Sequence, residues 1–358
     1  MKTRAQSLLG KTPLGADPEL DSLAMQLANR ASGARASRTL AQYKEPWKDF
    51  LAWAEQKQSA GADIYDMPPE IVAMYLTRVF MTAEADDVGH GRVATASAAI
   101  ACHFFLAGRP SPTDHPTCTL VREISKRTLR AGKLQRGSMQ PDHVRALVAR
   151  FAGPDASLPD LMIVTCVVIM FAGFLRFSDI AQVSARHDLL VISLTHMTLD
   201  IPKSKTDQEG IGHTTRIARI GGPVCPVALT ERLLTLGAYI RIPRSPAEDV
   251  GPLLRRVKKT AQGHALQRTT GTDRSPVPCL SYTSFRDKFK EMCSEIGIDR
   301  GIMPHSMRIG GNSAAAAHGV SEEARKAHGR WKSDEMVQLY TRRNDDAALE
   351  VTRNLGLA

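Results

Sequence analysis

The last fifth of the chain carries three short segments: PHSMRIGG at residues 304–311, GRW at 329–331 and LYTR at 339–342. His305 and Arg308 are three positions apart, so on a helix they lie on one face. Trp331 and Tyr340 follow, nine positions apart, and Arg176 stands far upstream. These residues combine cations, neutral hydrogen-bond donors and a phenol, a set suited to chemistry on a phosphodiester.

A tyrosine nucleophile needs surroundings that stabilise negative charge, because a phenol has an ordinary pKa of about 10. Guanidinium and imidazole groups can stabilise the phenolate and the charge that builds on the phosphate oxygens. Arg176 and Arg308 suit this task, since a guanidinium stays charged and can fork onto two oxygens. His305 can donate to the same oxygens or carry the phenolic proton, and Trp331 offers a neutral indole N–H. Taken singly, such residues are more often structural, so only their joint pattern predicts a site.

Composition indicates an intracellular protein and is compatible with a polyanion as its partner. Lys and Arg outnumber Asp and Glu by 47 to 37 over 358 residues, giving a net charge of +10 and a pI of about 9.4. Nucleic acid suits such a balance, although a merely basic protein explains the charge equally well. The six cysteines include no C-x-x-C pair, which argues against a structural zinc site and a disulfide framework. A reducing compartment follows.

The sequence predicts no cofactor, no metal and no membrane segment. No cluster of metal-ligand residues is evident, so fixed cations would have to replace a metal ion in the chemistry. Residues 1–18 are polar and lack the apolar core of a secretory signal. The most apolar run is LMIVTCVVIMFAGFL at 161–175, which is too short to span a bilayer and indicates a buried helix ending at Arg176.

The N-terminal part predicts a disordered tail followed by four helices. Residues 1–20 are interrupted by Gly, Pro and Ser and are expected to be disordered. Apolar residues at helical spacing between 40 and 54 predict a first helix, in which Pro46 should cause a kink or a new start. The other three helices are expected after the proline pair at 68–69, over 93–106 and over 116–134.

The C-terminal part predicts a mostly helical domain with one small antiparallel sheet. Residues 189–201 and 214–220 are rich in β-branched residues with partial alternation, which indicates a hairpin around a turn at 203–212. The pattern is helical from 281 onward. The segment 241–278 is rich in Pro, Arg and Gly and is expected to be an insertion loop.

Four segments of the C-terminal half resemble the boxes of the tyrosine recombinase (phage-integrase) family. FLRFSDI at 174–180 is similar to the first box, where Arg is followed three positions later by an acid, and KSKT at 203–206 is similar to a hairpin turn that carries Lys. His305 and Arg308, with Gly311 following, resemble the second box, and GRW with a Tyr nine positions later resembles the third. Trp331 resembles the residue that Cre-type members carry at this position, where many other members of the family carry His.

The resemblance covers residues 37–345, and in the N-terminal half it is a similarity of pattern alone. It implies a mainly α, two-domain DNA clamp: a SAM-like core-binding domain at 21–134, a linker at 135–139 and a catalytic domain at 140–358. The implied activity is site-specific recombination or integration of a mobile element, by cleavage and religation of DNA. The implied partners are double-stranded DNA and further copies of the chain, as a tetramer on DNA.

The same resemblance implies the role of each residue. Tyr340 would attack the scissile phosphate and leave a 3′-phosphotyrosyl link. Lys205 would protonate the departing 5′-oxygen, with Lys203 as the alternative. The phosphate would be held by Arg176, His305 and Arg308 and supported by Trp331. Asp179 would buttress the first of these arginines rather than act on DNA.

Basic side chains outside the boxes are candidate DNA contacts. The helix expected over 116–134 carries Arg122, Lys126, Arg127, Arg130 and Lys133, largely on one face. A DNA-facing helix and a solvated helix face explain this pattern about equally well. The run LRRVKK at 254–259 offers further phosphate contacts, with a solvated loop as the simpler interpretation. His328 is out of register with the third box and is interpreted as a surface or helix-packing residue.

Alternatives to a recombinase remain open at this point. A type IB topoisomerase or telomere resolvase would keep the chemistry, but the separate four-helix domain and short tail favour a recombinase. A domesticated, inactive DNA-binding protein is disfavoured by the complete residue set, and a generic basic scaffold leaves Arg176 and Lys205 unexplained. The tail is expected to form a helix over 344–355, whose apolar face either packs on its own domain or docks on a neighbouring copy.

Overall fold

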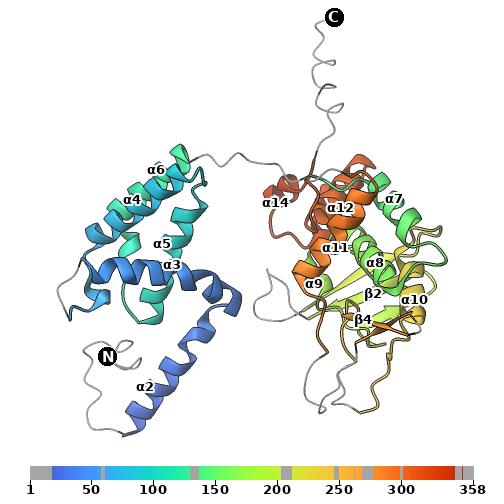
Figure 1. Ribbon diagram of the computed structural model, residues 1–358, viewed down its shortest axis with the longest axis horizontal. Helices are drawn as coiled ribbons and strands as arrows, with labels where there is room; N and C mark the ends of the chain where they lie inside the picture. Colours follow the sequence, from blue (N-terminus) through green and yellow to red (C-terminus); the bar gives the residue numbers. More distant parts are fainter. Residues whose placement is uncertain are drawn as a thin grey trace, which may run out of the picture. The chain divides into compact units, whose positions relative to one another are not determined.

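The computed structural model describes residues 18–57, 61–129, 137–202, 212–245, 250–261, 263–267, 277–298 and 301–342, and residue 349. The chain divides into two compact units, Met1–Leu134 and Gln135–Ala358, and each is described by itself (Figure 1). Both units are mainly helical, and the second also contains small antiparallel sheets. The expectation of a mainly α fold with a small antiparallel sheet is therefore confirmed.

The described part of the first unit contains five α-helices, one more than expected. They are α2 (Pro18–Arg30), α3 (Ser37–Glu55), α4 (Pro69–Ala85), α5 (Gly91–Leu106) and α6 (Pro116–Thr128). Helix α2 is the addition, and it begins at Pro18, within the segment predicted to be disordered. Its Leu20, Leu23 and Leu27 are exposed. The core of this unit instead comes from the other four helices and from Met67 and Leu129.

Helix α3 excludes one of the two expectations for Pro46, and helix α6 is shorter than predicted. Helix α3 continues through Pro46 instead of starting anew there. Proline inside a helix costs a main-chain hydrogen bond. The burial of Trp47 and Phe50 on the inner face offsets that cost, because burying one large apolar side chain contributes about 1.5–3 kcal/mol. Helix α6 ends at Thr128, earlier than predicted, with Leu129 as its C-terminal cap.

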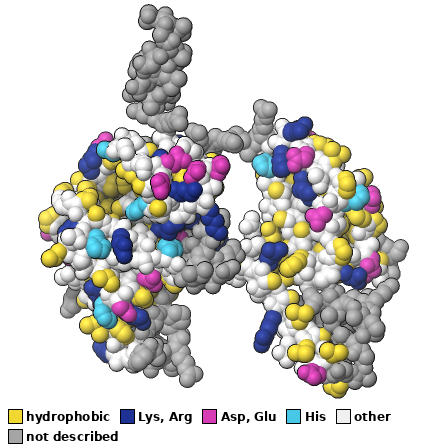
Figure 2. All heavy atoms as spheres, turned by 180° about the vertical axis from the view of Figure 1, so that it is seen from behind, with side chains coloured by type: hydrophobic (Ala, Val, Ile, Leu, Met, Phe, Trp, Pro, Cys, Tyr) yellow, Lys and Arg dark blue, Asp and Glu magenta, His cyan; other side chains and the backbone are white. Residues whose placement is uncertain are grey.

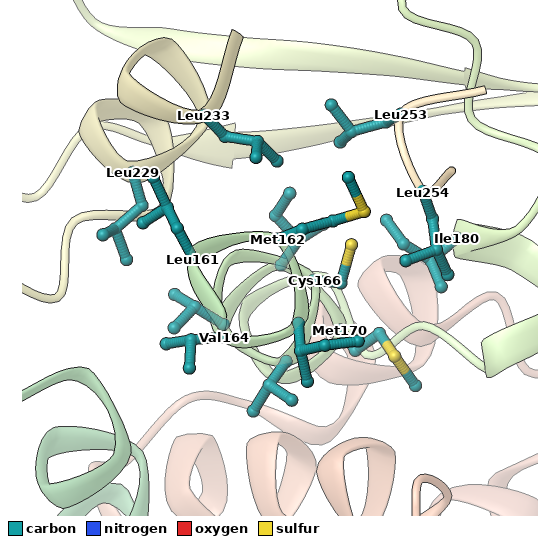
Figure 3. Close-up of a cluster of buried hydrophobic side chains, with 14 of the residues drawn as sticks. Leu161, Met162, Val164, Cys166, Met170, Ile180, Leu229, Leu233, Leu253 and Leu254 are labelled. Atoms are coloured by element: carbon teal, nitrogen blue, oxygen red, sulfur yellow. The ribbon is translucent and has the colours of Figure 1, made fainter. Parts of the chain in front are cut away.

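The second unit is built around α8 (Leu158–Ala172), the helix predicted to be buried. Residues 161–170 of α8 are all buried. Figure 3 shows Leu161 and Met162 of α8 packed among Leu229 and Leu233 of α10 (Pro226–Leu236) and Leu253 of a following segment. Helix α7 (Pro141–Phe151) covers another side of α8. Burial on all sides explains why the sequence of α8 is apolar without a polar stripe.

The buried helix ends at Ala172, four residues before the predicted end at Arg176. Gly173 caps α8, and Phe174 then adopts a left-handed backbone conformation with φ of 49°. This turn redirects the chain, so that Arg176 becomes the N-cap residue of the short helix α9 (Phe177–Ile180). The change of direction places Arg176 at the start of a new element instead of inside the core.

The sheet of the second unit has three strands rather than a simple hairpin. Its order is β1 (Leu190–Ile192), β2 (His196–Ile201) and β3 (His213–Ala218), all antiparallel. The segment predicted as one strand over 189–201 therefore breaks in two. Ser193 makes the break, because its Oγ accepts the backbone N–H of Thr195 and of His196 in a tight turn. The turn predicted at 203–212 between β2 and β3 lies outside the described residues except for Gly212.

The segment predicted as an insertion loop contains a second hairpin, β4 (Val257–Thr260) and β5 (Gly263–Leu266). Arg255, predicted to contact phosphate or solvent, is buried instead. Its guanidinium donates to the carbonyl oxygens of Val250 and Pro252 and lies 4.7 Å from the centre of the Tyr239 ring. This residue therefore stabilises the loop, whereas Lys258 and Lys259 of β4 are exposed.

The C-terminal part is helical, as expected. It contains α11 (Tyr282–Glu295), α12 (Ser306–Ala317), α13 (Glu322–Gly329) and α14 (Asp334–Leu339). Helix α12 lies close against α8 (Figure 1). A Cβ added at Gly310 would collide with the carbonyl oxygen of Met139, and one at Gly311 with that of Phe171. Glycine is needed at both positions for this approach. Apart from residue 349, the tail helix predicted over 344–355 lies outside the described residues.

Candidate active site

Arg308 is the centre of the candidate site. It lies in the first turn of α12, and its side chain is 1% exposed. One guanidinium nitrogen donates to the carbonyl oxygen of Phe174, and the other donates to that of Gly329 at 2.6 Å. One acceptor precedes Arg176 by two residues and the other precedes Trp331 by two. Arg308 therefore joins segments that are more than 150 positions apart in the chain.

The charge of Arg308 has no carboxylate in direct contact among the described residues. Burial, followed by the guanidinium groups of Arg176 and Arg330, lowers the pKa of Arg308 to about 9, and Asp179 opposes the shift only in part. The side chain is therefore charged at neutral pH but costly to keep charged. A bound phosphate would remove that cost, because its oxygens offer the missing negative charge.

Trp331 and Tyr340 lie against the guanidinium of Arg308, and Trp331 and His305 lie against the ring of Tyr340. The Cζ atom of Arg308 lies 4.4 Å from the centre of the Trp331 ring and 5.5 Å from that of Tyr340. The ring of Tyr340 is 5.5 Å from that of Trp331 and 5.3 Å from that of His305, in an edge-on arrangement with the latter. Trp331 also packs on Phe174 at 6.0 Å.

The indole N–H of Trp331 is a buried donor with no acceptor in the described part of the chain. Trp331 itself is 6% exposed. A buried N–H without a partner costs about 1–3 kcal/mol, so such a group calls for a ligand. Because Trp331 lies over the Arg308 guanidinium, an anion bound at Arg308 is a suitable acceptor.

Asp179 acts on Arg176 through the main chain. Its carboxylate is fully buried and accepts the backbone N–H of Arg176 at 2.9 Å, which closes the capping box of α9. A second cation, Arg330, lies 3.8 Å from the same carboxylate and donates to the hydroxyl of Thr215 on β3. Arg330 has a left-handed backbone, with φ of 54°, at the end of α13. Asp179 therefore holds the first turn of α9, and with it the base of Arg176.

The structure brings together five of the residues singled out in the sequence: Arg176, His305, Arg308, Trp331 and Tyr340. Lys203 and Lys205 lie outside the described residues. Reasoning from the sequence missed three residues. Arg330 lies near Asp179 and donates to Thr215, and Asn312 and Arg325 hydrogen-bond to Thr341. The sequence signal for Arg330 was its place inside the GRW segment, between two residues already singled out.

The candidate DNA-facing helix α6 needs one correction. Arg122 is half-buried, and its guanidinium donates to Ser97, to Thr119 and to the carbonyl oxygen of Thr113. We therefore assign Arg122 to holding α6 in place. Lys126 is exposed and pairs with Glu123 at 2.6 Å, and Arg127 is exposed. Arg130 and Lys133 lie outside the described residues. Figure 2 shows Lys and Arg on the surfaces of both units, with acidic side chains among them.

His328 proves to be a packing residue, one of the two interpretations offered for it. Its Nε2 lies 2.8 Å from the carbonyl oxygen of Ala172, and its ring meets that of Phe174 edge-on at 4.7 Å. Burial lowers the pKa of His328, which favours the neutral ring. The described residues contain no cluster of His, Cys, Asp and Glu that could hold a metal ion. Nor does that part of the chain include a helix long and apolar enough to cross a bilayer.

No family model matches the chain. Among curated proteins, it is 23% identical over 324 residues to an integrase/recombinase xerD homolog of Selenomonas ruminantium, over 89% of this chain and 85% of that protein.

Several solved structures share the fold. One is the XerH site-specific recombinase in a post-cleavage complex with a palindromic difH substrate, with a TM-score of 0.58, 10% identity, and coverage of 98% of this chain and 93% of that one. Another is the Tn1549 transposon integrase with transposon right end DNA, with a TM-score of 0.52, 13% identity, and coverage of 93% and 97%. A lambda integrase dimer on a core site gives a TM-score of 0.52, 13% identity, and coverage of 90% and 94%.

The fold is thus that of the two-domain tyrosine recombinases. The sequence is in addition similar to that of the xerD homolog over most of both chains.

Proposed function

We propose that the chain is a site-specific DNA recombinase that cuts and rejoins DNA through a 3′-phosphotyrosyl intermediate. The observation that carries this proposal is the convergence on Arg308. Beside this buried cation lie Tyr340 and Trp331, and the indole N–H of Trp331 has no acceptor among the described residues. His305 packs against Tyr340, and Arg176 is near enough to lower the pKa of Arg308. Such a set can bind a phosphate and offer it a nucleophile.

In the proposed reaction, the Tyr340 oxygen bonds to phosphorus while the bond from phosphorus to the 5′-oxygen breaks. The phenolic proton passes to His305 or to solvent, and Lys205 gives a proton to the 5′-oxygen, which leaves as a hydroxyl. The 5′-hydroxyl of another strand then attacks the phosphotyrosine, and the steps run in reverse. The bond energy is kept in the link, so religation needs no ATP or other cofactor. Arg176 and Arg308 hold the phosphate throughout.

The domains receive corresponding roles. We assign residues 21–134 to a core-binding domain and 140–358 to the catalytic domain, joined by a linker at 135–139, as a clamp on double-stranded DNA. A Cre-like active site with Trp331, assembly as a tetramer on DNA, service to a mobile element and an intracellular location with DNA belong to the same proposal. A type IB topoisomerase-like or telomere-resolvase-like enzyme and an inactive DNA-binding protein are the alternatives.

A trapping experiment tests this function. The protein is incubated with duplexes that carry a nick next to candidate sites, so that a cleaved end diffuses away and religation fails. A covalent adduct that survives denaturation, mapped to Tyr340 by digestion, supports the enzyme. Strand transfer between two duplexes separates a recombinase from a topoisomerase, which relaxes supercoils only. DNA binding without any adduct would favour the inactive protein.

Lys205→Ala is expected to slow cleavage selectively, because the 5′-oxygen then leaves without its proton. A substrate with sulfur in place of the bridging 5′-oxygen needs no such proton, since a thiolate is a much better leaving group. It should restore the rate of Lys205→Ala. Rescue of Lys203→Ala instead would assign the general acid to Lys203. Rescue of neither variant would exclude both lysines from that role.

Deleting residues 347–358 is expected to leave a folded protein that binds one half-site with unchanged affinity. Cooperative binding to paired half-sites and recombination should both be lost, because the apolar face of the tail is proposed to dock on a neighbouring copy. Gel-shift titrations on single and paired sites measure this. Unfolding of the truncated chain would mean that the tail packs on its own domain. Unchanged cooperativity would show that the tail takes no part in the contact between neighbouring copies.

A further inference from the structure

A buried hydrogen-bond network ties the segment that carries Tyr340 to helices α12 and α13. Asn312 of α12 is fully buried, and its Nδ2 donates to the hydroxyl of Thr341 at 3.0 Å and to the carbonyl oxygen of Val337 at 3.3 Å. Arg325 of α13 is 7% exposed, and its Nη1 lies 3.1 Å from both Asn312 Oδ1 and Thr341 Oγ1. We call Asn312, Arg325 and Thr341 the α14 anchor.

The donors and acceptors of the α14 anchor complement one another. A guanidinium can only donate, so the amide oxygen of Asn312 must face Arg325 and its NH2 group must face Val337 and Thr341. The hydroxyl of Thr341 accepts from both partners and donates to the carbonyl oxygen of Val337 at 2.8 Å. Because each group satisfies another, removing one leaves buried partners unpaired, at a cost of about 1–3 kcal/mol.

The contacts lie on both sides of Tyr340. Val337 and Thr341 are held by the anchor, and the backbone N–H of Arg342 donates to Ser313 Oγ at 2.8 Å. Helix α14 itself has six residues, of which only Val337 is buried. Apolar packing of α14 therefore rests mainly on one side chain, and the polar contacts supply much of the remaining restraint.

The anchor also connects Tyr340 to the groups proposed to hold the phosphate. Asn312 lies one helical turn after Arg308 on α12, and residues four apart share a face. A single rigid helix thus holds Arg308 in its first turn and, through Asn312 one turn later, the segment that carries Tyr340. The relative position of the phenol and the bound phosphate then depends on α12 and on the integrity of the anchor.

We infer that Asn312, Arg325 and Thr341 are positioning residues, which hold the Tyr340 phenol in line with the phosphate bound at Arg308. None of the three is proposed to contact the phosphate. The inference rests on the proposed function, in which Tyr340 is the nucleophile. Misplacing a nucleophile by about 1 Å can cost on the order of a hundredfold in rate, so a network that fixes it has a large effect without adding affinity for DNA.

The test compares Thr341→Val with Thr341→Ser. Valine has nearly the shape of threonine but neither donates nor accepts, whereas serine keeps the hydroxyl. The maximal single-turnover rate of adduct formation should fall about 10- to 100-fold in Thr341→Val and stay within about threefold in Thr341→Ser. The DNA concentration that gives half this rate should not change in either. Asn312→Asp keeps the pairing with Arg325 but loses both donors, so it should resemble Thr341→Val.

Amide hydrogen exchange of the peptide 334–342 provides a reading that needs no activity. Faster exchange in Thr341→Val and Asn312→Asp, with exchange of α8 unchanged, is expected. Unchanged exchange would overturn the anchor. Faster exchange with a normal cleavage rate, or a loss confined to DNA affinity, would overturn its role in positioning. A wild-type protein that forms no adduct on any substrate would instead overturn the proposed function, and the exchange data would still decide on the anchor.

Discussion

Replacing Tyr340 by Phe is expected to abolish covalent attachment of the protein to DNA. The change removes the only atom proposed to attack phosphorus, so adduct formation should fall by at least about a thousandfold. The ring remains, and with it the contacts to Trp331 and His305 that pack this part of the site. The fold should therefore persist. Half-site affinity should remain nearly the same, because phosphate contacts over a wide interface dominate DNA binding and one hydroxyl adds little.

Tyr282→Phe is the matched control for Tyr340→Phe. Tyr282 lies on α11 of the same unit, its side chain is 42% exposed, and it packs edge-on against Phe177. This control should cleave at the wild-type rate. Both variants are measured in the trapping assay, beside gel-shift titrations at one fixed salt concentration. An adduct trapped with Tyr340→Phe would show that another residue attacks, and the assignment of the nucleophile would fail.

The local parts of the site were predictable from the sequence, because their geometry depends on spacing alone. His305 and Arg308 fall within one turn of each other wherever a helix begins near 305, and α12 begins at Ser306. The contact of Arg308 with the segment before Arg176 is different. No spacing rule connects Arg308 with Phe174, 134 positions away, and only the resemblance to known boxes suggested that these segments meet.

The parts that sequence reasoning missed depend on tertiary contacts, which bury polar side chains that the local sequence gives no reason to bury. Neither Asn312 nor Arg325 was singled out in the sequence, because Asn312 stands in a run of small residues and Arg325 stands among charged ones. Both are buried because Thr341 and Val337 satisfy them from a different segment. Arg255 is similar: the adjacent Leu253 and Leu254 are drawn into the core, and its guanidinium finds backbone carbonyls there.

Helix α2 was missed for another reason. Leu20, Leu23 and Leu27 occur at helical spacing and Pro18 suits the first turn, so the signal was present. It was outweighed by the Gly, Pro and Ser residues just before it. The division of 189–201 into β1 and β2 was less accessible, because partial alternation continues across the turn at Ser193 and only the hydroxyl contacts of that residue mark the break.

Arg308→Lys is expected to be nearly as damaging as Arg308→Ala, with cleavage about a hundredfold slower than in the wild type. Losing one preorganised donor to the transition state typically costs on the order of 3 kcal/mol. Lysine keeps a charge but not the fork, and it cannot hold the carbonyl oxygens of Phe174 and Gly329 while also reaching a phosphate. The Lys variant therefore loses both the clamp on the phosphate and the link between the two segments.

Arg232→Lys is the matched control, because the guanidinium of Arg232 also donates to backbone carbonyls, those of Ala152 and Pro154 among them, but away from the proposed site. It should cleave within about twofold of the wild type. Melting temperatures of both variants show whether a lower rate merely reflects unfolding. Recovery of most of the wild-type rate by Arg308→Lys would contradict the bidentate role.

The pH dependence of Arg308→Lys separates loss of the fork from loss of the charge. Burial and the guanidinium of Arg176 lower the pKa of Arg308 to about 9, and the same surroundings should lower the pKa of a lysine from its ordinary value near 10.4. The protonated form is the active one, so activity is present below the lowered pKa and is lost as the pH rises through it. Because lysine starts about 2 units below arginine, the residual activity of Arg308→Lys should decline at a lower pH than that of the wild type. A flat residual rate between pH 6 and the pH at which the wild type declines would mean that the ammonium stays charged and that geometry alone accounts for the loss.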